Sequence, residues 1–323
     1  MARAELGDGG GLADYSEAIA LASKAGQGRD VALLHNNYGM ALWCFEGPSA
    51  ALEVIRAGAD FAKARGLNEV TSALMQSRLD ALVDLGELGE VVVLASEIAP
   101  ILEAIGNIWD LTGIRSAQLR VLCLRGEASD AGEMIDWLES SSRHLEGADD
   151  VVQGLGPTAL ARAALGQNEV AEEQLAEIEA FPVARGTPYY AVFLPAMVRS
   201  ALAIGNAELA ERFVAGYEPR YPYAEHALVA ARAVLAEARG DLVAAADAYA
   251  DSADRWERFG VVPEQGFALM GQGRCLLGLS QPTEAIPALQ HAREIFERLK
   301  ATPVLAETAQ LLHRAAELMP SEH

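Results

Sequence analysis

The sequence predicts an all-α fold, a solenoid of about seven to eight antiparallel helix hairpins in units of about 40 residues. Two regularities support this prediction. Seven glycines recur at steps of 35 to 40 residues, and small or apolar residues stand five positions after six of them. The glycines are Gly47, Gly86, Gly126, Gly166, Gly205, Gly240 and Gly278. The residues after them are Leu52, Val91, Ala131, Ala171, Ala210 and Ala245.

The first helix of each pair is expected to end at its glycine in a left-handed C-cap. Apolar residues recur before the glycines at three- and four-residue steps, as Leu74, Leu79, Leu82 and Leu85 do before Gly86, which is typical of an amphipathic helix. The second helices are expected to end at a further set of breaks. These breaks are Gly66, Gly106, Gly147, Gly186, Pro219, Gly260 and the Thr302-Pro303 pair.

Seven hairpins fit between about residues 29 and 300, with single helices over 12–24 and 304–318 closing the two ends. We therefore expect one domain over 12–319, a flexible tail over 1–11 and a second tail over 320–323. Gly154, Gly156 and Pro157 are expected to interrupt the first helix of the fourth pair, and Pro195 to kink that of the fifth. We therefore expect the helical-repeat domain to bend at about residues 150–200.

Charge excludes several classes of partner. The chain has 25 basic and 46 acidic residues, a net charge of −21, which repels nucleic-acid phosphates and anionic membranes. The three cysteines form no CxxC pair, and no apolar leader or membrane-length apolar stretch is visible. We expect a cytoplasmic protein that binds neither nucleic acid nor membrane.

The sequence gives only weak indications of catalytic, metal-binding or cofactor-binding motifs. Residues 154–159 fit GxGxxA, but helical patterns flank them where a dinucleotide site needs a strand. The sequence contains no HExxH, GxSxG, EF-hand or GxxxxGK[ST] pattern, and its six histidines are scattered. We predict no catalytic residues, no metal site and no cofactor, and hence a protein that is not an enzyme.

The glycine and the small residue five positions later resemble the tetratricopeptide repeat pattern. The chain also resembles the C-terminal helical-repeat region of bacterial, actinobacterial-type signalling proteins that carry a class III cyclase or P-loop ATPase, including LuxR-type regulators. Residues 33–38, 41–43, 46–48, 79–86, 236–241, 273–277 and 292–299 carry this resemblance. It implies a right-handed superhelix and a sensor or interaction region of a signalling or transcription regulator. No cyclase core, phosphate loop or terminal helix-turn-helix accompanies it here.

In tetratricopeptide-type stacks the first helices line a concave groove, and the resemblance assigns groove positions to this chain. The candidates for partner contact are Asn37, Gln76, Asp80, Ser116, Arg120, Gln153, Arg199 and Gln272. Side-chain amides can pair with an extended peptide backbone. The predicted function is a non-catalytic scaffold for a protein or peptide partner, basic by charge complementarity, or for an effector domain absent from this chain. Solvated polar positions on an open face are the alternative interpretation.

A second hypothesis is a small-molecule sensor with a pocket near the aromatic-rich stretch 181–223. Its candidate residues are Tyr189, Tyr190, Phe193 and Tyr217. Aromatic side chains can wall a ligand pocket, although such a cluster can also fill an irregular joint between helices. Arg162 and Arg274 stand four positions before their glycines, where an apolar packing residue is expected. The sequence leaves homo-oligomer formation and the identity of the partner open.

Overall fold

The computed structural model describes residues 2–181 and 183–319, and in these residues every regular element is a helix. The prediction of an all-α fold is confirmed. The elements are α1 (Ala2–Glu5), α2 (Gly11–Lys24), α3 (Gly28–Phe45), α4 (Pro48–Lys63), α5 (Asn68–Asp84), α6 (Leu88–Ile105), α7 (Ile108–Arg125), η1 (Ala128–Ala131), α8 (Gly132–Leu145), α9 (Ala148–Ala164), α10 (Asn168–Ala180), η2 (Ala184–Gly186), α11 (Pro188–Ala203), α12 (Ala207–Val214), α13 (Pro222–Ala238), α14 (Leu242–Phe259), α15 (Val262–Gly278), α16 (Pro282–Leu299) and α17 (Thr302–Leu318).

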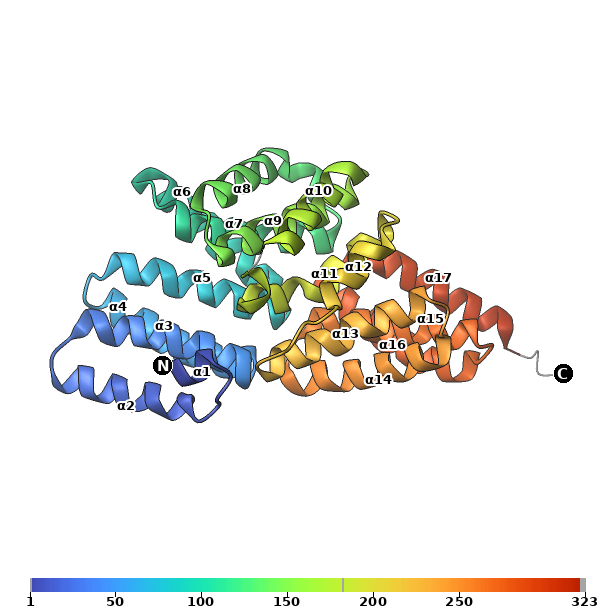
Figure 1. Ribbon diagram of the computed structural model, residues 1–323, viewed down its shortest axis with the longest axis horizontal. Coiled ribbons are helices and arrows are strands. Elements are labelled where there is room, and N and C mark those ends of the chain that lie inside the picture. Colours follow the sequence, from blue (N-terminus) through green and yellow to red (C-terminus); the bar gives the residue numbers. More distant parts are fainter. Residues whose placement is uncertain (1, 182, 320–323) are drawn as a thin grey trace.

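The helices pack neighbour to neighbour in chain order, from α2 against α3 to α16 against α17. Figure 1 shows α2 to α5 at one end of the molecule, α13 to α17 at the other, and α6 to α10 as a layer above them. Pairs α3–α4 to α15–α16 match the predicted hairpins, with α2 before them and α17 after them. The predicted N-terminal tail contains α1, whose Arg3 pairs with Asp8 at 2.9 Å. The predicted tail 320–323 lies outside the described residues.

Glycine ends most of the first helices as predicted, because six of the seven repeat glycines have positive φ. Gly278 is the exception, and the prediction is wrong there. It is the last residue of α15, and Ser280, with φ 60°, takes the left-handed position instead. A Cβ on Gly278 would lie 2.7 Å from Leu242 Cδ1, so this glycine gives α14 room to approach.

The predicted interruption of the fourth pair is also wrong, because α9 runs through residues 154–157 without a break. The glycines serve close packing instead. A Cβ on Gly154 would overlap the Ser142 hydroxyl of α8, and one on Gly156 would lie 2.9 Å from the ring of Phe193 in α11. Proline is likewise accommodated within continuous helices, as Pro157 in α9 and Pro195 in α11.

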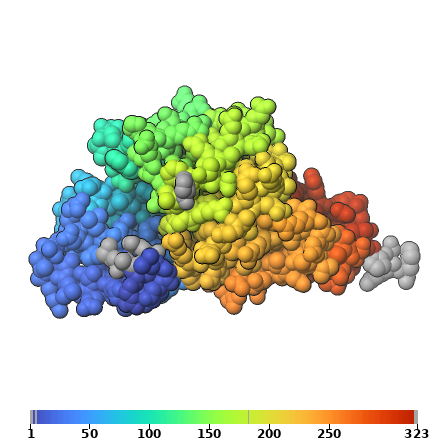
Figure 2. All heavy atoms as spheres, viewed as in Figure 1, coloured from blue at the N-terminus to red at the C-terminus, as the bar shows by residue number. Residues whose placement is uncertain are grey.

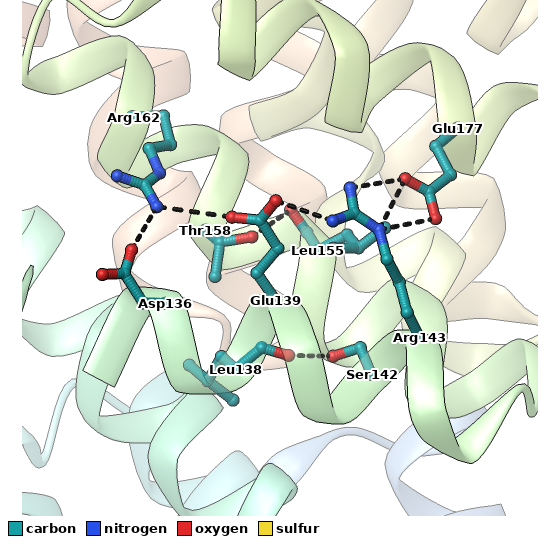
Figure 3. Close-up of polar contacts among 9 residues, drawn as sticks. All are labelled: Asp136, Leu138, Glu139, Ser142, Arg143, Leu155, Thr158, Arg162 and Glu177. Atoms are coloured by element: carbon teal, nitrogen blue, oxygen red, sulfur yellow. Dashed lines mark hydrogen bonds and ion pairs between the residues drawn. The ribbon is translucent and has the colours of Figure 1, made fainter. Parts of the chain in front are cut away.

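Ion pairs tie α8, α9 and α10 together (Figure 3). Arg162 of α9 pairs with Asp136 at 2.5 Å and with Glu139 at 3.3 Å, both in α8. Arg143 of α8 pairs with Glu177 of α10 at 2.8 Å. Arg162 therefore occupies an apolar position of the repeat pattern because two carboxylates of the preceding helix receive it.

Early and late helices meet although they lie far apart in sequence. Helix α3 packs against α13 and α7 against α17, and Figure 2 shows the surface of the first residues adjoining that of residues near 220–250. At these contacts glycine keeps the distance short. A Cβ on Gly86 would lie 2.8 Å from Leu299 Cδ2, and one on Gly126 would lie 2.7 Å from Pro303 Cγ. The ends of α5 and α7 thus abut the far end of the chain.

Candidate functional site

Two carboxyl groups and one guanidinium group lie buried where these helices converge. Asp80 and Asp84 stand one turn apart on α5, and their side chains are 2% exposed. Arg120 of α7 reaches both of them. Its Nη1 lies 3.3 Å from Asp80 Oδ1 and its Nη2 lies 2.8 Å from Asp84 Oδ1. One guanidinium group therefore serves two buried acids.

Three aromatic side chains from distant parts of the chain donate to the same carboxyl groups. The Tyr189 hydroxyl of α11 donates to Asp80 Oδ2 at 3.0 Å. Asp84 Oδ2 accepts from the Trp43 indole of α3 at 2.8 Å and from the Tyr223 hydroxyl of α13 at 3.1 Å. Because buried polar groups are costly unless bonded, this cluster fixes the relative positions of α3, α5, α7, α11 and α13.

Burial dominates the titration of these acids. It raises the pKa of Asp80 to about 7, with a further upward contribution from Asp84, against the opposing effects of Arg120 and the Tyr189 hydroxyl. Burial also raises the pKa of Asp84, although Arg120, Trp43 and Tyr223 all favour its charged form. The cluster therefore retains a proton at pH values where exposed carboxyl groups have lost theirs.

Most of the predicted groove residues join this cluster. Gln76 Nε2 donates to Gln153 Oε1 and to the Tyr189 hydroxyl, both at 3.3 Å. The Ser116 hydroxyl donates to the backbone carbonyl of Gln153 at 2.7 Å. The structure thus brings together Gln76, Asp80, Ser116, Arg120, Gln153 and Tyr189, which bond to one another.

The other predicted site residues are dispersed. Asn37 of α3 lines a separate cavity of about 290 Å³, and Gln272 of α15 is half-buried and outside the cavities described here. The rings of Tyr190 and Tyr217 pack in a tilted arrangement with 5.2 Å between centroids, and the Tyr190 hydroxyl donates to the Phe213 carbonyl at 2.8 Å. These two tyrosines fill the joint between α11 and the segment after α12.

Beside the buried cluster lies a central cavity of about 370 Å³. Its wall comes from α5, α7, α9, α11, α13, α15 and α17. Most of the wall is aliphatic or aromatic, and the charged lining residues are Asp84, Arg120, Arg199 and Glu264. Phe193, a predicted pocket residue, faces this cavity, with the Arg120 guanidinium 5.5 Å from its ring centroid. The cavity thus joins one predicted pocket residue to two predicted groove residues.

An ion pair crosses between α11 and α15 at the edge of the cavity. Arg199 donates from Nη1 to Glu264 Oε2 at 2.8 Å and from Nη2 to Glu264 Oε1 at 2.6 Å. Its guanidinium carbon lies 4.1 Å from the ring centroid of Phe267. This two-point geometry fixes the Arg199 side chain in the cavity wall.

A second cavity of about 510 Å³ continues from the first along α11, α13, α15 and α17. The two share Arg199, Ala203, Glu264, Phe267 and Val304 as lining residues. In the second cavity Arg274 binds Glu237 from Nη2 at 2.8 Å and Glu307 from Nη1 at 2.8 Å. Arg274 is therefore a cavity residue, which explains its departure from the apolar repeat pattern.

Several residues of this site are not predicted from the sequence. Asp84 and Glu264 were not predicted, although the spacing of Asp80 and Asp84 by one helical turn was a usable signal. Trp43 and Tyr223 could not be assigned, because their partner Asp84 lies 41 and 139 positions away. Long-range convergence of this kind leaves no local pattern in the sequence.

No protein-family model matches the chain, and no curated protein is significantly similar to it. Within residues 2–181 and 183–319, no group of three or more His, Cys, Asp or Glu side chains is arranged to hold a metal ion. Among the described helices, none combines the length and apolar character needed to cross a membrane.

Proposed function

We propose that this protein is a non-catalytic helical-repeat module that binds a small molecule in the central cavity. The observation that carries the proposal is the cavity of about 370 Å³, with its mainly apolar wall and its two arginines. Ligand sites in proteins are commonly concave, largely apolar and of about 300–1,000 Å³, with a few polar groups that orient the ligand. Phe193 and Tyr223, which belong to the aromatic stretch 181–223, line this cavity and support the proposal.

The buried cluster supports this proposal because it makes the cavity wall rigid. Arg120 is held by two carboxyl groups, and Arg199 by both oxygens of Glu264. A preformed wall lowers the entropic cost of binding.

We also propose that the hairpins form a right-handed superhelix with about five pairs in each turn. The contacts of α3 with α13 and of α7 with α17 support this number, since each joins helices five pairs apart. The resemblance to bacterial regulators supports a signalling or transcription-regulating role in the cytoplasm. In such a role the bound ligand would alter contacts with an effector domain or partner.

A cavity-filling variant tests the proposal. Ala203 is exposed and lines both cavities, so Ala203→Trp fills the space without crowding the core. A metabolite that stabilises the wild type in a thermal-shift screen should lose its effect on this variant. At a concentration of one hundred times Kd the wild type should gain about 2.7 kcal/mol.

Ala207→Trp is the matched control, because Ala207 is exposed at the start of α12 and lines neither cavity. Ligands should stabilise this variant as they do the wild type. A ligand whose effect survives Ala203→Trp binds elsewhere. If every stabilising compound behaves in that way, the cavity is not the site.

A second candidate function is capture of a basic protein or peptide segment along the same inner face. Two cavities in series and a net charge of −21 favour it. Of the predicted groove amides, Gln76 and Gln153 bond to each other, so Arg199 and the carboxylates near it would make the contacts. Fluorescence anisotropy with an arginine-rich peptide tests this candidate, and binding that Ala203→Trp leaves unchanged would contradict it.

A further inference from the structure

We infer that the ligand of the joined cavities is an organic cation with an apolar body, such as an arylalkyl amine. This inference rests on the proposed function and adds the chemical class of the ligand. It follows from the charge of the walls, from the way in which their arginines are shared, and from the aromatic faces between them.

The first step is the charge of the lining. Four carboxyl groups line the two cavities, and three guanidinium groups accompany them. The carboxyl groups belong to Asp84, Glu237, Glu264 and Glu307. The guanidinium groups belong to Arg120, Arg199 and Arg274. Asp80 lies directly behind Arg120, at 3.3 Å, and adds another acid to the same region.

The second step is how these groups are paired. At one end Arg120 is shared by Asp80 and Asp84. At the other end Arg274 is shared by Glu237 and Glu307. Arg199, between them, is matched by Glu264 alone in the described ion pairs. The Arg274 end of the joined cavity therefore has one more acid than base. The middle is balanced, and so is the Arg120 end while its buried cluster retains a proton.

The position of Glu307 makes its charge available. Its side chain is 45% exposed, and Arg274 contacts it through Oε1. Glu237, in contrast, receives Arg274 on both oxygens and the Tyr249 hydroxyl on one of them. A cation entering the second cavity would therefore meet Glu307 first and would remove an unmatched charge from a partly desolvated wall.

The third step is the aromatic lining. The rings of Phe193, Tyr223 and Phe267 line the first cavity, and that of Tyr249 lines the second. Two of these rings already face guanidinium groups, Phe267 at 4.1 Å and Phe193 at 5.5 Å. Aromatic faces attract cations, most strongly where water is excluded. An amine on an apolar skeleton therefore satisfies both the charge and the surface of the cavity.

Three probes with nearly the same skeleton test the inference on the full chain. Isothermal titration at pH 7 with 2-phenylethylamine, 2-phenylethanol and phenylacetate should give that order of affinity. We expect the amine to bind at least about tenfold more tightly than the carboxylate. Glu307→Gln should weaken the amine about fivefold and leave the alcohol unchanged. Glu257→Gln, at an exposed position of α14 outside both cavities, is the control and should change neither.

The outcomes separate this inference from the proposed function. If the alcohol or the carboxylate binds as tightly as the amine and Ala203→Trp abolishes that binding, the cavity is a ligand site but the inference of a cation is wrong. If the amine binds equally to Glu307→Gln and to the wild type, the inference is also overturned. The same holds if none of the probes binds at millimolar concentration, whereas the proposed function is then decided by the wider metabolite screen.

Discussion

The surroundings of Asp80 differ from those of an ordinary, exposed aspartate. Asp80 shares Arg120 with Asp84, accepts a bond from Tyr189 and has a side chain that is 2% exposed. A single guanidinium group cannot fully offset two charges taken out of water. The stability of the protein should therefore depend on whether Asp80 carries its proton.

Asp80→Asn should change how stability depends on pH. The pKa of Asp80 is about 7 in the folded protein and near its usual value of about 4 in the unfolded chain. Between these values the folded state binds the extra proton, so the wild type loses stability as the pH rises from 4 to 7. The variant has no carboxyl group at this position, so it cannot lose stability through deprotonation there. Urea unfolding should show the variant gaining on the wild type by up to about 1.4 kcal/mol per pH unit.

Groups that titrate in both proteins contribute equally to the pH dependence of stability, so their contributions cancel when the variant is compared with the wild type. His226 has a pKa lowered to about 4 by burial, with the nearby arginines adding to the effect. It therefore contributes stability that is gained as the pH rises from 4 to 6.5, the opposite sign. Asp247→Asn, at an exposed position of α14, is the control and should follow the wild type. A constant difference between Asp80→Asn and the wild type across this range would contradict the prediction.

At the scale of the element, α9 is the helix most closely surrounded by its neighbours. Its residues 151–159 are all buried, and it packs against α7, α8, α10 and α11. Gly154 and Gly156 permit this, since a side chain at either position would meet α8 or α11. Here glycine weakens helix propensity but allows tight packing.

Gly154→Ala should destabilise the protein although alanine favours helices. The added methyl group would overlap the Ser142 side chain of α8, and we expect a loss of about 1–3 kcal/mol in the free energy of unfolding. Gly89→Ala is the matched control. Gly89 also lies within a helix, and the space around its Cβ position is open, so the substitution should stabilise by up to about 1 kcal/mol. Stabilisation by both changes would show that α8 is free to move away.

The sequence predicted the helices well because their signals are local. The spacing of Gly86 and Gly126 gave the ends of α5 and α7 directly, since a left-handed residue is needed there. The same reasoning predicted a helix break at Gly154, which is wrong. A glycine that is needed for close packing cannot be told apart in the sequence from one that is needed for a turn. Asp80 and Arg120 were predicted as groove positions for partner contact, and in the structure they pair with each other in the buried cluster. The bonds around them were not predicted, because Tyr189 reaches Asp80 and Tyr223 reaches the neighbouring Asp84 only in the folded chain.

At the scale of the whole molecule, contacts between early and late helices should make unfolding cooperative. Repeat arrays with only neighbour contacts can unfold in steps. Here Trp43 and Tyr223 bond to the same oxygen of Asp84, and their rings lie 5.6 Å apart. The loss of either end of the chain would expose this cluster, and the other end would be destabilised with it.

We therefore expect urea unfolding of the Trp109→Phe, Trp137→Phe double variant to be a single transition. Trp43 in α3 and Trp256 in α14 then report on the two ends by fluorescence, and far-UV circular dichroism reports on all the helices. The two signals should coincide. Tyr223→Phe should lower both midpoints equally, since it removes one bond to Asp84. Separate midpoints would mean that the ends unfold independently.

The distance in sequence between Asp84 and Tyr223 also bears on how the chain matures on the ribosome. The aspartate is made 139 positions before the tyrosine that donates to it. Until α13 emerges, the inner side of the first helix pairs stays in contact with water, and its carboxyl groups remain hydrated. The early hairpins can thus assemble as translation proceeds. They exclude water from their inner side only after the last third of the polypeptide has been synthesised.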